Sequence, residues 1–241
     1  EVEEIDKVLK TGRIQTQLFI KENGTEEAFK ALSGKGRRII HIATHGYYIP
    51  EQQSISSPLD SLLKQNNTIA PNQSILRRSG LLLSGCNLSL QGAMPNSQLE
   101  DGILTTDEIS QMNLKGTDII VLSACETGLG EITGEGVFGL QRGFKKAEAN
   151  SLLMSLWKVD DNATRLLMTE FYKNLLAGKS KFESLRKAQE YVRDYEEDIE
   201  IAPDKRWESQ IRQKVNKNKE PPPKIEKIKR YISPYYWAAF I

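Results

Sequence analysis

The fold is decided by residues 118–128, which read DIIVLSACETG. An almost continuous apolar run of this kind is typical of a central strand that is covered on both faces, because neither face meets water. A second such run lies in a strand predicted over residues 38–44, and the stretch 38–46 reads RIIHIATHG. Two covered strands predict a mostly parallel sheet, and each of them runs into a residue that can carry chemistry.

Helical patterns alternate with these strands. Apolar spacing and capping residues predict helices over residues 2–9, 25–32, 105–112, 137–146, 163–176 and 180–195. Further strands are expected over residues 15–20, 81–84, 151–157 and 235–241. Strands that alternate with helices predict an α/β fold with a mostly parallel central sheet and helices on both faces.

Two polar stretches interrupt this pattern. Residues 47–78 are rich in Gln, Asn, Ser and Pro, and they are expected to form a long surface loop or insertion. Residues 196–230 form a charged insertion, in which 204–230 hold ten Lys or Arg and four Asp or Glu. We expect a solvated segment without fixed structure there, and a docking site for an acidic partner is the alternative.

The length fits one large domain or two small ones, of which a single domain over residues 1–241 is expected, and the missing Met indicates a piece of a longer chain. With 33 Lys and Arg against 32 Asp and Glu, the charge gives no reason to expect direct nucleic acid contact. No apolar run approaches the roughly 20 residues that a membrane span needs, so no membrane contact is expected.

The cysteine and histidine content points away from disulfides and metals. Two cysteines exclude a disulfide framework and favour a reducing, cytoplasmic location. His41, His45, Cys86 and Cys125 lack the spacing of a zinc site. We therefore expect neither a metal nor a cofactor.

His45 and Cys125 each follow one of the two apolar strands. Ligands of open α/β sheets bind beyond the carboxyl ends of the strands, so neighbouring strands would bring the two side chains to one crevice. A thiol becomes a useful nucleophile at neutral pH when an imidazole lies beside it. Gly46 and Cys125 can each present a backbone N–H group to a developing oxyanion.

The order of short motifs resembles the caspase-like cysteine peptidases. It is closer still to the CHAT domains, bacterial caspase-like modules that are usually attached to tetratricopeptide repeats. The matching motifs cover nearly the whole chain: IATHG at 42–46, SGLLL at 79–83, EDGILT at 100–105, VLSACETG at 121–128, GEGV at 134–137, GLQR at 139–142, SLWKVDD at 155–161 and the closing run 235–240. The charged insertion and Ser233, where the family often has His, depart from the family pattern.

The resemblance implies a caspase-like three-layer sandwich and a cysteine endopeptidase that cleaves a protein or peptide substrate. Cys125 would be the nucleophile, His45 the general acid and base, and Gly46 and Cys125 the oxyanion donors. Ser123 matches the position that lines the pocket for the substrate residue before the cut (P1). A tetratricopeptide-repeat region in the same chain or a regulatory partner would control the activity. The alternative is a non-catalytic caspase-like module that binds peptides or serves as a scaffold.

Other candidate residues have a structural interpretation beside the functional one. His41 is expected to be a core histidine with satisfied hydrogen bonds, and a rival general base is the alternative. Glu126 either tunes the thiolate or bonds the following loop. Asp160 and Asp161 precede a predicted helix, so one of them is expected to cap it. Separases carry a similar run whose acid faces a basic P1 residue, and Asp161 matches that position.

Overall fold

The computed structural model describes residues 1–49, 75–92, 100–123, 131–133, 136–201 and 224–241. Its central sheet has the order β1 (Ile39–Ile42), β5 (Ile119–Leu122) and β8 (Leu152–Met154). All neighbouring strands in this sheet are parallel. The predicted parallel sheet is confirmed, and the two apolar runs are neighbours in it.

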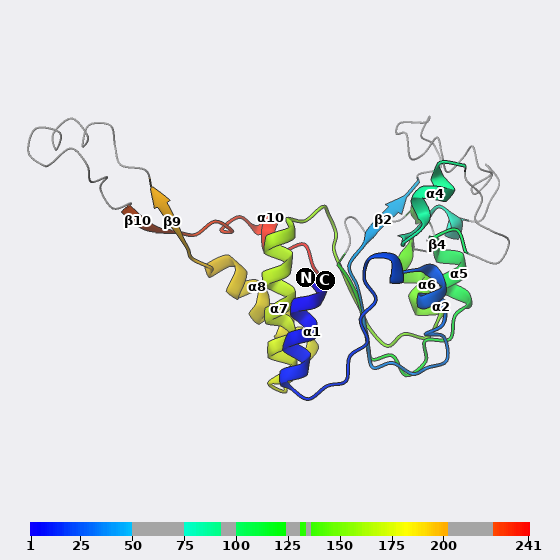
Figure 1. Cartoon of the computed structure of the whole chain (residues 1–241), viewed down its shortest axis with the longest axis horizontal. Coiled ribbons are helices and arrows are strands. Elements are labelled where there is room, and N and C mark those ends of the chain that lie inside the picture. Colours follow the sequence, from blue (N-terminus) through cyan, green and yellow to red (C-terminus); the bar gives the residue numbers. More distant parts are fainter. Residues whose placement is uncertain (50–74, 93–99, 124–130, 134–135, 202–223) are drawn as a thin grey trace, which may run out of the picture.

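Helices cover both faces of this sheet, as predicted (Figure 1). On one side lie α1 (Val2–Thr11), α7 (Asp161–Leu176) and α8 (Lys181–Asp194). On the other side lie α2 (Glu26–Lys30), α5 (Thr106–Gln111) and α6 (Leu140–Lys146). Successive residues of a strand point to opposite faces, so Val121 enters the first core while Ile120 and Leu122 enter the second. This explains why the strand is apolar at every position.

A second sheet, which the sequence analysis did not anticipate, is antiparallel. Its order is β2 (His45–Tyr48), β3 (Ser79–Leu82) and β4 (Ile103–Thr105). The predicted 38–44 strand therefore ends at Ile42, and the chain enters the second sheet at His45. Short helices complete this part: α4 (Cys86–Leu90) and the 3-10 turns η1 (Lys21–Asn23) and η2 (Ile75–Arg77). A further hairpin joins β6 (Glu131–Thr133) to β7 (Gly136–Phe138).

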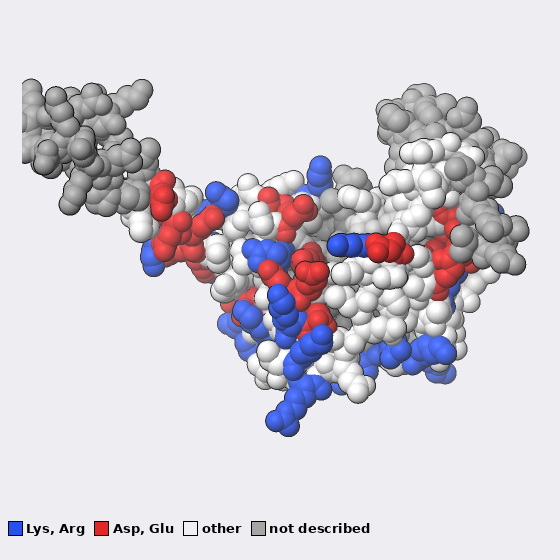
Figure 2. Space-filling model, viewed as in Figure 1, with Lys and Arg blue, Asp and Glu red and all other residues white. Residues whose placement is uncertain are grey.

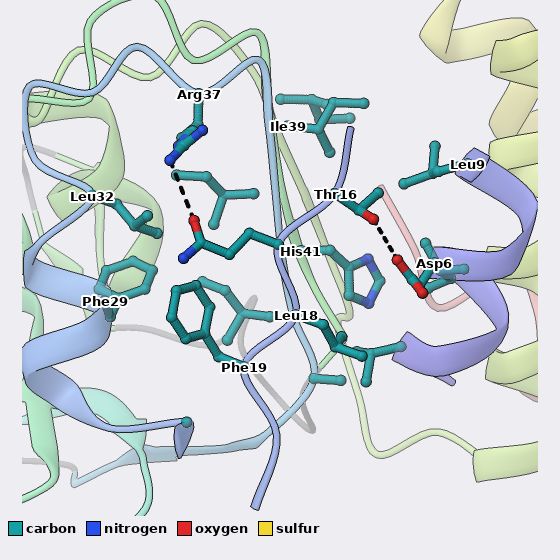
Figure 3. Close-up of a pocket in the computed structure, with 18 of the residues that line it drawn as sticks. Asp6, Leu9, Thr16, Leu18, Phe19, Phe29, Leu32, Arg37, Ile39 and His41 are labelled. Carbon is teal, nitrogen blue, oxygen red and sulfur yellow. Dashed lines mark hydrogen bonds between the residues drawn. The ribbon is translucent and has the colours of Figure 1, made fainter. Parts of the chain in front are cut away.

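The predicted strand over residues 15–20 is wrong. The segment is extended but pairs with none of the described strands. Side chains anchor it instead, because the Thr16 hydroxyl donates to Asp6 and the Arg37 guanidinium donates to Gln17 (Figure 3). Thr16 thus ties the segment to α1, and Gln17 ties it to a residue that lies two positions before β1.

The predicted last strand over residues 235–241 is wrong in its first half. Residues Pro234–Trp237 form the short helix α10, which the Ser233 hydroxyl caps. Proline at the first helical position favours this turn, because its fixed φ suits a helix start. The final residues do join the sheet edge, since Met154 and Ile241 exchange two backbone hydrogen bonds of 3.0 and 3.1 Å.

Part of the charged insertion is ordered, against the prediction. β9 (Glu197–Ile201) and β10 (Lys224–Ile228) form an antiparallel hairpin that extends away from the body (Figure 1). In the predicted 47–78 loop, residues 47–48 belong to β2 and residues 75–77 form η2. The rest of that loop, over residues 50–74, lies outside the described residues.

Candidate active site

His45 lies where the two sheets meet. It is the first residue of β2, it stands opposite Leu82 of β3, and its side chain is exposed. Directly before it, the Thr44 hydroxyl donates to the Leu82 carbonyl. Gly46 follows in the same ladder. The antiparallel sheet therefore fixes the backbone at His45, three residues after the parallel sheet fixes Ile42.

Cys125 and Glu126 lie outside the described residues, together with the glycines at 128, 130 and 134. The structure does describe the strand that leads to them. Ile42 stands opposite Leu122, and the Ser123 N–H donates to the Ile42 carbonyl at 2.9 Å. Cys125 is thus the third residue after Leu122, as His45 is the third after Ile42. The neighbouring strands that the predicted dyad requires are present.

His41 is a largely buried histidine with both ring nitrogens satisfied, as predicted. Its Nδ1 lies 3.0 Å from the Tyr172 hydroxyl, and its Nε2 lies 2.7 Å from Glu1 Oε1. The other oxygen of Glu1 accepts a hydrogen bond of 2.9 Å from the Ser123 hydroxyl. Sequence reasoning missed Glu1, because no spacing rule links a residue at the start of a helix to two strands.

Asp160 is the helix cap of the two aspartates. Its carboxylate accepts the Ala163 N–H at 2.9 Å and so satisfies one free donor at the start of α7. Asp161 is the first helical residue, and its side chain is exposed. Asp161 is therefore the candidate pocket acid whose carboxylate does not cap the helix.

A cavity of about 1750 Å³ runs between the 14–20 segment and the edge of β1. Apolar side chains from both walls enter it, including Leu18, Phe19 and Ile39 (Figure 3). Both histidines, His41 and His45, line it as well. The cavity thus connects the buried histidine with the exposed one.

An acidic cluster lies on the side of the central sheet that α2 and α5 cover. Carboxylate oxygens of Glu26, Glu100 and Glu108 come within 4.8 Å of one another. The Lys30 ammonium contacts all three, at 2.7, 2.9 and 2.9 Å. Burial, with the nearby charges of Glu108 and Asp101, raises the pKa of Glu26 to about 7. The ammonium takes the place that a cation would need, so the described geometry favours ion pairing over a metal.

The remaining thiol has an environment unlike that of a nucleophile. Cys86 is half-buried in α4, and burial raises the pKa of its thiol. A raised pKa keeps this thiol protonated at neutral pH, so Cys86 has the properties of a structural cysteine.

The charged side chains of both signs interleave over α1 and α7 on the face shown in Figure 2. Such a mixture creates little net field across that face. Among the described helices, each is too short or too polar to cross a lipid bilayer.

Comparison with known proteins now adds to this geometry. The CHAT domain family matches residues 1–241. Two curated relatives are each called tetratricopeptide repeat protein 28: the mouse protein is 31% identical over 94 residues and the human protein 30% identical over 94 residues. Each match covers 39% of this chain and only about 4% of the relative's length. The match over the whole sequence, together with a parallel sheet covered by helices on both faces, shows that this chain belongs to the CHAT domain family, with a caspase-like α/β fold.

Proposed function

We propose that this domain is a cysteine endopeptidase that cuts a protein substrate with Cys125 and His45. The observation that carries the proposal is the register of β1 and β5, in which Ile42 stands opposite Leu122. Each dyad residue follows the last residue of its strand by three positions, so the two segments that carry the dyad leave the sheet at the same edge. Membership of a caspase-like family supports the same reaction.

In this reaction the Cys125 thiolate attacks the scissile carbonyl, and the N–H groups of Gly46 and Cys125 stabilise the oxyanion. The carbon–nitrogen bond then breaks, leaving a thioester, and His45 gives its proton to the departing amine. A water molecule attacks the thioester while His45 takes a proton from the water. The thiolate then leaves, which releases the new carboxylic acid and restores the starting pair of Cys125 thiolate and protonated His45.

Substrate choice would be set around Ser123, which precedes Cys125 by two residues, with Glu126 and Asp161 as further candidates. A small side chain at Ser123 leaves room for a long P1 side chain. The Asp161 carboxylate would pair with Arg or Lys there. We therefore expect a basic P1 residue to be preferred over an acidic one.

The domain would act in the cytoplasm under the control of an attached or partner region. The two curated relatives bear the name of a tetratricopeptide repeat protein, which supports such a region as the regulator. The low cysteine content supports a reducing compartment.

The test uses a peptide library and a biotinylated peptidyl electrophile that reacts with thiols. We expect Cys125→Ala and His45→Ala each to abolish cleavage while the thermal unfolding midpoint changes little, and the two losses to be non-additive because the residues act as a unit. Cys86→Ala is the matched control, and it should keep both cleavage and labelling. If the folded protein cleaves no peptide and its labelling does not depend on Cys125, the non-catalytic peptide-binding module is favoured instead.

A further inference from the structure

A chain of hydrogen bonds links Tyr172, His41, Glu1 and Ser123. The Tyr172 hydroxyl lies 3.0 Å from His41 Nδ1, and His41 Nε2 lies 2.7 Å from Glu1 Oε1. Glu1 Oε2 accepts from the Ser123 hydroxyl at 2.9 Å. Only 9% of the His41 side chain and 16% of the Glu1 side chain are exposed. The carboxylate at the start of α1 is therefore held almost out of solvent by two different strands.

With a ring proton on Nε2, His41 can satisfy every group in this chain of hydrogen bonds. The Tyr172 hydroxyl then donates to Nδ1, the Nε2–H donates to one oxygen of Glu1, and the Ser123 hydroxyl donates to the other. This tautomer is assigned from the pattern of partners. Networks in which each donor has an acceptor hold their members in one geometry, whereas the loss of a member leaves a buried polar group unpaired.

The two partners of Glu1 belong to the two strands that lead into the dyad. His41 lies in β1, four residues before His45. Ser123 follows β5, two residues before Cys125. One carboxylate thus ties both strands at the edge where the chain leaves the sheet.

We infer that Glu1 is a positioning residue, which holds the ends of β1 and β5 at the spacing that the His45–Cys125 pair requires. The inference rests on the proposed function. A misplacement of about 1 Å at such a pair can cost on the order of a hundredfold in rate.

Glu1 also precedes the first turn of α1, and α1 packs against α7. A movement of α1 along α7 would withdraw the carboxylate from both strands, so α1 is the element through which a regulatory region can act on the dyad.

The test measures how fast iodoacetamide alkylates Cys125 between about pH 5 and 9, because this rate reports the thiolate without a known substrate. All variants carry Cys86→Ala, so that only one thiol reacts. Glu1→Ala should slow alkylation at neutral pH by roughly tenfold or more and move the apparent pKa of the reaction upward. Glu1→Gln keeps an acceptor for one partner and should retain an intermediate rate.

The matched control is Glu4→Gln. Glu4 lies in the same helix and pairs with Arg165 of α7 at 2.9 Å, and its carboxylate is not a member of the hydrogen-bond chain that links Tyr172, His41, Glu1 and Ser123. Because this ion pair is solvent-exposed, its loss weakens the docking of α1 on α7 only slightly and leaves the carboxylate bridge in place. Glu4→Gln should therefore leave the pH profile of alkylation unchanged.

A second variant, Ser123→Ala, removes the other end of the bridge, and the Glu1→Ala and Ser123→Ala effects should be non-additive. A wild-type rate and pH profile in folded Glu1→Ala overturns the positioning role, while His45→Ala still slows the reaction. If His45→Ala has no effect on alkylation of the parent protein, the proposed function falls and the role of Glu1 falls with it.

Discussion

Glu26 is a residue whose pKa the fold moves into the physiological range. Its side chain is almost fully buried at the start of α2, where one oxygen pairs with Lys30 and the other accepts the Gly102 N–H. Burial raises its pKa from near 4.5 to about 7. A raised pKa means that the folded state binds the proton more tightly than the unfolded state does. The stability from this proton is complete below about pH 4.5 and is lost as the pH rises through about 7.

Glu26→Gln tests this prediction, because the amide mimics the protonated acid at every pH. The free energy of unfolding of the wild type, relative to Glu26→Gln, should fall by about 1–3 kcal/mol between roughly pH 5 and 8. Urea unfolding at several pH values measures the difference. Glu27→Gln is the control, since the Glu100 N–H lowers the pKa of Glu27 and its contribution is instead lost on acidification. A difference for Glu26→Gln that is flat with pH contradicts the prediction.

At the scale of single residues, the sequence predicts those whose role depends on neighbours close in the chain, such as helix caps. Thr105 and Glu108 form a capping box at the start of one predicted helix, and Thr25 and Ser180 cap the starts of two others. The contact of Glu1 with Ser123 joins residues 122 positions apart, and only the folded topology brings them together. A residue that acts across such a distance has no local signature.

At the scale of the element, the start of α7 separates two roles that the sequence left open. Asp160→Ala removes the bond to the Ala163 N–H, so it should lower the free energy of unfolding by about 1 kcal/mol. Asp161→Asn keeps the cap and should cost at most about 0.5 kcal/mol, from a weaker interaction with the helix dipole. Thermal or urea unfolding of both variants measures the contrast. Equal effects would show that the cap does not distinguish the two aspartates.

The same pair of variants tests P1 choice. A positional-scanning peptide library should show a basic P1 preference for the wild type and for Asp160→Ala, and a weaker one for Asp161→Asn. The reason is that only the Asp161 carboxylate is free to pair with Arg or Lys. A wild type that prefers Asp or an aliphatic residue, or an Asp161→Asn variant with an unchanged preference, refutes the pocket acid.

The central strands and long helices were predicted because their patterns are strong, and the errors fall where a pattern competes with tertiary contacts. Residues 15–20 have strand-like residues, but Thr16 and Gln17 bond to Asp6 and Arg37 rather than to a strand. The sequence pattern does not reveal the antiparallel sheet, because only two residues separate β1 from β2. The two strands together therefore look like one apolar run. At Gly80 a Cβ atom would lie 2.8 Å from the Tyr47 ring, a close approach that the motif SGLLL contains but does not explain.

At the scale of the whole molecule, the body consists of two layers of helices around the sheet, and the β9–β10 hairpin stands outside it (Figure 1). The first residue after the hairpin that enters the core is Tyr231, which is buried and packs against Tyr195 and Tyr236 with ring centroids 6.1 and 5.3 Å apart. The boundary between arm and body therefore lies between β10 and Tyr231.

Replacing residues 197–228 with a short Gly/Ser linker should leave the unfolding midpoint within about 3 °C of the wild type. An isolated two-stranded hairpin contributes little stability, and Glu197 and Ile228 stand opposite each other, so a short linker can close the gap. The ion pair between Arg230 and Glu197 is lost, but both side chains are partly exposed and such pairs contribute little to stability. Tyr231→Ala is the contrasting variant, and it should cost about 3–5 kcal/mol, or roughly 10 °C, because it empties a core position. Differential scanning calorimetry measures both changes. A large drop for the linker variant would mean that the arm packs on the body and is part of the stable fold.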